Sequence, residues 1–131
     1  MITVSELRKI AKARLRDSDV LYANRRYDGA IYLCGYAVEI SLKARICKVL
    51  KWADFPFTPN EFKNYQSFKT HDLDILLKLS GRQTKIKTNY MVEWSIIATW
   101  DPETRYKSIG SANRSDARDM IQSVKTLLGV L

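Results

Sequence analysis

The chain has 131 residues, which is the size of a single domain spanning 1–131, and 46% of them are apolar, enough for an ordinary hydrophobic core. Lys and Arg number 22 against 14 Asp and Glu, and most of the excess positive charge falls within residues 1–51. Such a surface attracts nucleic acid or another anionic partner, although an ordinary solvated surface explains the same charge equally well.

The composition also excludes several classes of protein. No segment offers the roughly eighteen uninterrupted apolar residues that a membrane-spanning helix needs, and the charged N-terminal segment differs from a secretory signal, so a cytoplasmic protein is expected. Cys34 and Cys47 are separated by about 20 Å along one predicted helix, too far for a disulfide. With His71 as the single histidine, neither a metal site nor another cofactor is expected.

Apolar residues recur at helical spacing from the N-terminus onward. A first stripe predicts a helix that starts near Val4 and ends near Asn24, a residue that suits a left-handed stop. A second helix is predicted over residues 27–50, and its apolar surface is so broad that it should lie centrally and contact several other helices.

The second half of the chain predicts shorter elements. Two prolines predict a loop over residues 53–69, and a short helix follows over residues 70–81 with Thr70 as its N-cap. The segment "RQTKIKT" (82–88) is expected to be a polar connector, with further helices over 89–100 and 115–131. No strand is predicted. These elements predict an all-α fold, an antiparallel up-and-down bundle of four to five helices.

The middle of the second predicted helix contains three residues that are unusual in a core. A buried Glu39 would need the charge of Lys43, one turn later, or of an arginine from another helix. Gly35 costs about 1 kcal/mol against alanine in a helix, so its presence predicts the close approach of another helix.

Residues 27–44, "YDGAIYLCGYAVEISLKA", resemble the second-helix signature of HEPN-domain proteins. The matching residues are Tyr27, Ala30, Tyr32, Gly35, Tyr36, Ala37, Glu39, Leu42 and Lys43. The segments "HDLDILL" (71–77) and "WDPETRY" (100–106) are similar to later landmarks of the family, in the same order. The resemblance covers roughly residues 3–130. It implies a HEPN-like helical bundle, often a homodimer, that works near nucleotides or RNA and often accompanies a nucleotidyltransferase.

Other members of that family are metal-independent ribonucleases of toxin and defence systems, in which an arginine precedes a histidine by four to six intervening residues. The corresponding positions before His71 are Asn64, Tyr65 and Gln66, so this motif is absent and no catalytic residue is expected. The sequence therefore favours a non-catalytic binding module. The alternatives are a divergent ribonuclease that uses the loop at 105–108, and a purely structural helical partner.

Two sets of candidate site residues follow. The candidate ligand-binding residues are Glu39, Lys43, Arg105, Tyr106 and Lys107. The alternative for this set is that Tyr106 packs and Arg105 pairs with an acidic residue such as Glu39. His71 is interpreted as a neutral, hydrogen-bonded packing residue.

The candidate nucleic-acid patch consists of Lys9, Lys12, Arg16, Arg25 and Arg26. The nearby rings of Tyr22 and Tyr27 add the stacking surfaces that single-stranded nucleic acid uses. An ordinary charged pair of helices has the same composition.

Overall fold

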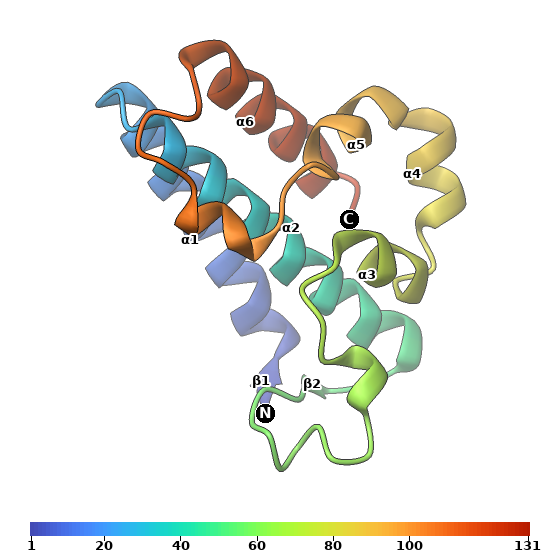
Figure 1. Ribbon diagram of the computed structural model, residues 1–131. Coiled ribbons are helices and arrows are strands. Elements are labelled where there is room, and N and C mark those ends of the chain that lie inside the picture. The colour runs from blue at the N-terminus through green and yellow to red at the C-terminus, as the bar shows by residue number, and fades with distance from the viewer.

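Helices dominate the computed structural model, which describes residues 1–103 and 106–131, so Thr104 and Arg105 lie outside the described residues. Figure 1 shows the arrangement. The α-helices are α1 (Val4–Ala23), α2 (Tyr27–Leu50), α3 (Leu73–Leu79), α4 (Gln83–Asn89), α5 (Met91–Ile97) and α6 (Arg114–Leu128). The remaining elements are β1 (Ile2–Thr3), β2 (Asp54–Phe55) and the 3-10 helices η1 (Gln66–Phe68) and η2 (Pro102–Tyr106). The predicted all-α class is confirmed.

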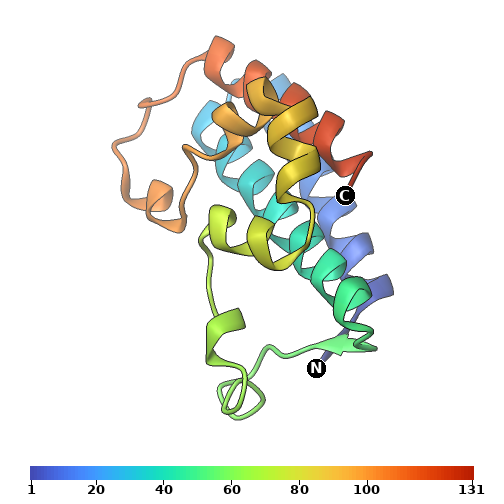
Figure 2. The same ribbon diagram turned by 90° about the vertical axis from the view of Figure 1, so that its right-hand side faces the viewer.

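The second helix, α2, is the centre of the molecule. It pairs with α1 and also packs against α3 and α6, while α5 packs against α6 (Figure 1). In Figure 2, α3 and α4 lie in front of α2, and α1 lies behind it. The broad apolar surface predicted for residues 27–50 therefore has the several helical neighbours that it implied.

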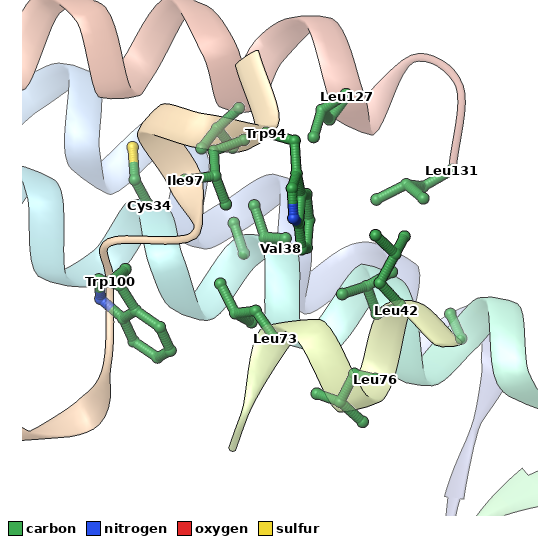
Figure 3. Close-up of a cluster of buried hydrophobic side chains, with 14 of the residues drawn as sticks. Cys34, Val38, Leu42, Leu73, Leu76, Trp94, Ile97, Trp100, Leu127 and Leu131 are labelled. Carbon is green, nitrogen blue, oxygen red and sulfur yellow. The ribbon is translucent and has the colours of Figure 1, made fainter. Parts of the chain in front are cut away.

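Figure 3 shows the part of the core where side chains of α2, α3, α5 and α6 meet. The buried side chains labelled there are Cys34, Val38, Leu42, Leu73, Leu76, Trp94, Ile97, Trp100, Leu127 and Leu131. Both cysteines are free thiols, and burial raises the pKa of Cys34 and of Cys47 to about 11. Within the described residues, no helix combines the length and the apolar character needed to cross a bilayer.

Several local predictions were wrong. The segment expected to be a polar connector forms α4, because its single apolar residue, Ile86, is fully buried and anchors the turn. The loop expected after α2 contributes β2, which pairs antiparallel with β1 through Ile2 and Phe55. The N-cap of α3 is Asp72, whose carboxylate accepts from the backbone N–H of Ile75 at 3.1 Å. Thr70 instead accepts from the backbone N–H of Asp72.

The end of α1 uses an arginine where glycine is usual. The backbone N–H groups of Arg26 and Arg25 donate to the carbonyls of Leu21 (2.8 Å) and Tyr22 (3.1 Å), the pair of bonds that closes a left-handed helix stop. The left-handed residue is Arg25, with φ of 61°, and not the expected Asn24. A side chain there costs about 1–2 kcal/mol. Lys51 ends α2 in the same way, with φ of 57°.

Candidate functional site

Gly35 makes room for an indole ring. A Cβ atom placed on Gly35 would lie 2.1 Å from ring atoms of Trp100, which no real contact allows. The indole N–H of Trp100 donates to the carbonyl of Tyr32 at 3.1 Å, and the ring of Tyr36 meets it edge-on at 5.3 Å between centroids. The close approach predicted at Gly35 exists, but a side chain and not a helix backbone makes it.

Glu39 is buried, with 3% of its surface exposed, and has two charged or titratable partners. Its Oε2 lies 3.1 Å from Nζ of Lys43, and its Oε1 lies 2.8 Å from Nδ1 of His71. The ammonium of Lys43 also lies 5.6 Å from the centroid of the Phe55 ring. The pairing of Glu39 with Lys43 follows the prediction, whereas the partner from another element is a histidine, not an arginine. We call Glu39, Lys43 and His71 the buried charge cluster, after the buried carboxylate that joins them.

His71 is not a packing residue, because 58% of its side chain is exposed. A carboxylate can only accept, so Nδ1 of His71 donates to Glu39 and Nε2 is left for water or a ligand. A neighbouring cavity of about 340 Å³ is lined by His71, Asp72, Asp74 and Asp101, among others. Three carboxylates around one imidazole repel a phosphate, so this cavity is poorly suited to a nucleic-acid backbone.

The structure spreads the candidate ligand-binding residues over different places. Glu39 and Lys43 contact each other, Tyr106 is 71% exposed, and Arg105 lies outside the described residues. Lys107 lines a separate cavity of about 440 Å³, whose walls include the carboxylates of Asp28, Asp116 and Asp119. In the described part of the chain, no three His, Cys, Asp or Glu side chains come together in a group that could hold a metal ion.

The exposed side of α1 carries a row of cations. Lys9, Lys12 and Arg16 are exposed and share one face of the helix, at intervals of about 4.5 and 6 Å along its axis. Lys9 contacts Glu6 at 3.4 Å, and both side chains are exposed. Lys12 and Arg16 form no ion pair with any described residue. These cations are therefore available to an external anion.

The turn between α1 and α2 carries two further cations. Arg25 and Arg26 are exposed, and among the described residues neither has an ion-pair partner. The rings of Tyr22 and Tyr27 lie beside the turn, 5.7 Å apart between centroids. We call Lys9, Lys12, Arg16, Arg25 and Arg26 the basic face.

Sequence reasoning missed one cation at this end of the molecule. Arg114, the first residue of α6, donates through Nε to the hydroxyl of Tyr22 at 3.2 Å, and its guanidinium lies 5.9 Å from the ring centroid. No local pattern signals this contact, because it depends on how α6 packs against the pair formed by α1 and α2.

Asp28 fixes the loop that precedes α6. Its carboxylate accepts from the backbone N–H groups of Gly110 (2.6 Å) and Ala112 (2.8 Å), and from the hydroxyl of Ser111 (3.5 Å). Gly110 has φ of 82°, a conformation that suits glycine. This tether places residues 109–112 beside the start of α2, with a cavity of about 450 Å³ between them. Sequence reasoning missed this cavity as well.

Comparison with known families gives one match, in the N-terminal part of the chain. The model of the HEPN domain family matches residues 4–58, from the first residue of α1 to the segment after β2. The match confirms the resemblance predicted from residues 27–44, and it includes the whole basic face together with Glu39 and Lys43. No curated protein and no solved structure matches the chain.

Proposed function

We propose that this chain, with its HEPN domain match over residues 4–58, is a non-catalytic module that binds single-stranded RNA through the basic face. The domain match supports a function related to nucleotides or RNA. The observation that carries the proposal is the row of exposed cations on α1 and the following turn, four of which have no ion pair with a described residue.

The positions of these cations suit a polyanion. The cations on α1 follow one another at intervals of about one turn, so several phosphates of one strand can be neutralised together. The rings of Tyr22 and Tyr27 lie at the end of the row, where bases can stack on the accessible parts of the rings. The buried charge cluster offers no such row, because Glu39 already holds Lys43 and His71.

The proposal includes the partners that the HEPN resemblance implies. The chain would self-associate as a homodimer, or bind a nucleotidyltransferase, within a system of the toxin–antitoxin type. Light scattering on the purified chain tests the first of these, since a single mass corresponding to one copy would exclude the homodimer.

Fluorescence anisotropy with a labelled RNA of about 20 nucleotides tests the binding itself. In the variant Lys12→Gln/Arg16→Gln we expect affinity to fall about tenfold and the slope of log K against log salt to become shallower by about 1.4, the value for two lost phosphate contacts. The matched control is Lys78→Gln/Lys85→Gln, which removes the same charge from α3 and α4, on the other side of α2 (Figure 2).

The control distinguishes binding at the basic face from binding driven by net charge alone. If both double variants lose affinity equally, net charge alone drives binding and the basic face is not the site. If the unmodified chain does not bind the RNA at all, the proposal fails.

The contact between His71 and Glu39 favours one second candidate, a divergent ribonuclease. An imidazole held through Nδ1 by a carboxylate leaves Nε2 free to exchange a proton with a substrate. The carboxylates of Asp72, Asp74 and Asp101 around the adjacent cavity oppose this candidate, because they repel the scissile phosphate. We expect no cleavage of labelled RNA in EDTA. Cleavage that disappears in His71→Gln or Arg105→Ala would replace the non-catalytic proposal.

A further inference from the structure

We propose that the cavity between the start of α2 and residues 109–112 binds the phosphorylated end of a nucleic-acid strand, namely one nucleotide that carries a terminal phosphate monoester. This inference rests on the proposed function. It names the chemical group that Arg25 and Arg26, the turn end of the basic face, recognise. Below, we call this cavity the end pocket.

The end pocket has the size and lining that a nucleotide needs. Its volume is about 450 Å³, and it is lined by residues of α1, the following turn, α2 and the loop before α6. Leu21, Tyr27 and Ile109 give it apolar walls, and the side chain of Ile109 is fully exposed, so nothing in the folded chain covers it. An aromatic ring next to aliphatic side chains is a surface on which a base can stack.

Two arginines line the same pocket. Arg25 and Arg26 have no ion pair with a described residue, and a guanidinium binds phosphate oxygens in a bidentate manner. A phosphate monoester carries a charge of about −1.5 to −2 near pH 7, compared with −1 for a phosphodiester inside a strand. Two unpaired guanidinium groups therefore match a terminal phosphate better than an internal one.

Asp28 also lines the pocket, but the two guanidinium groups outweigh its single negative charge. It accepts hydrogen bonds from the backbone N–H groups of Gly110 and Ala112, and from the Ser111 hydroxyl. These donors hold its oxygens toward the loop and offset part of its charge.

The position of the pocket favours the end of a strand over its middle. The chain reverses direction between Ala23 and Tyr27, and the tethered loop at 109–112 lies against that turn (Figure 1). We infer that a strand bound along the cations of α1 reaches the pocket only by passing over this turn, so that only its terminal nucleotide enters the pocket.

Arg25 allows a test that leaves the fold intact. Its left-handed backbone is one that glycine adopts without strain, so Arg25→Gly removes the guanidinium and keeps the turn. Lys51→Gly is the matched control, because it removes one positive charge from the other left-handed position, at the far end of α2. The 24 residues of α2 place the two sites about 36 Å apart.

The experiment compares RNAs of one sequence that carry a 5′-phosphate, a 3′-phosphate or hydroxyls at both ends. We expect one phosphorylated end to bind about tenfold more tightly than the hydroxyl end, the effect of charge-assisted hydrogen bonds to one group. Arg25→Gly and Arg26→Gln should abolish that preference, and Lys51→Gly should keep it. Adenosine monophosphate is the competitor that shows whether a free nucleotide fills the pocket as well as a strand end.

Each result separates this inference from the proposed function. If the chain binds all three RNAs with the same affinity, the end-pocket inference is wrong and the proposed RNA binding is supported. A preference that survives in Arg25→Gly also overturns the end pocket. If the chain binds adenosine monophosphate but no RNA, and Arg25→Gly loses that binding, the pocket binds a free nucleotide, and both the strand-end inference and the proposed function are wrong. Binding of neither overturns both.

Discussion

The buried charge cluster and the turn end of the basic face (Arg25 and Arg26) differ in whether their charged groups are paired. In the first, the carboxylate of Glu39 is buried and is bonded by both Lys43 and His71. In the second, Arg25 and Arg26 are exposed and have no ion pair with a described residue. The sequence predicts candidate site residues in both places, and only the structure shows that the charges of the first are paired and those of the second are not.

The physical reason for the difference is desolvation. A carboxylate removed from water is costly unless donors replace the lost water, so Glu39 is stable only while its partners stay bound to it. An exposed guanidinium has no such cost and can exchange water for a phosphate. Charged groups that satisfy each other hold a fold together, whereas unpaired charges at a surface are available for binding.

The largest expected effect is on the rate at which the buried cysteines of α2 react with a thiol reagent. Burial raises the pKa of Cys34 from 9.0 to about 11, so at pH 8 its thiolate is about a hundredfold scarcer than in the unfolded chain. We expect both cysteines to react with a thiol reagent about a hundredfold more slowly in the native protein than in denaturant. Rapid labelling of the native chain would show that the interior around α2 is open to solvent.

The second prediction concerns the space beside Gly35 that the indole of Trp100 occupies. In Gly35→Ala the new methyl group must displace the indole, so we expect the free energy of unfolding to fall by about 3 kcal/mol, measured by urea denaturation. Gly129→Ala is the control, because its Cβ would lie at an ordinary 3.4 Å from the nearest atom, and we expect almost no change. Equal stability of the two variants would mean that Trp100 does not occupy this place.

The third prediction concerns the negative charge of Glu39, which bonds both other members of the cluster. Glu39→Gln keeps the shape of the side chain but weakens its bonds to Lys43 and His71, so we expect a loss of about 2 kcal/mol in urea denaturation. RNA affinity should stay unchanged, because the cluster is not part of the basic face. A fall in affinity with unchanged stability would reverse the comparison and make the cluster a binding site.

The smallest effect on stability belongs to the turn. Arg25→Gly relieves about 1 kcal/mol of left-handed strain, and the extra freedom of glycine in the unfolded chain offsets most of it. We expect the melting temperature to change by less than about 3 °C, in the same direction as in Lys51→Gly. A large destabilisation of Arg25→Gly alone would mean that the arginine side chain supports the turn, and would weaken its assignment to a ligand.

Strong periodic patterns predicted the long helices well, and weak patterns failed. The apolar surface of residues 27–50 leaves a central helix as the only way to bury it, and α2 is that helix. The segment of α4 has one buried apolar residue, Ile86, and burial of that one side chain is a tertiary event. The pairing of β1 with β2 joins residues more than fifty positions apart, which local spacing cannot report.

By itself the sequence determined the helical class, the central place of α2 and the pairing of Glu39 with Lys43, because each depends on residues within a few turns of one helix. Tertiary structure decided the rest. It brought His71 to Glu39 across 32 positions, Trp100 to Tyr32 across 68, and Arg114 to Tyr22 across 92. These contacts depend on the angles at which short helices and loops pack, and those angles are set by the whole core and not by any one segment.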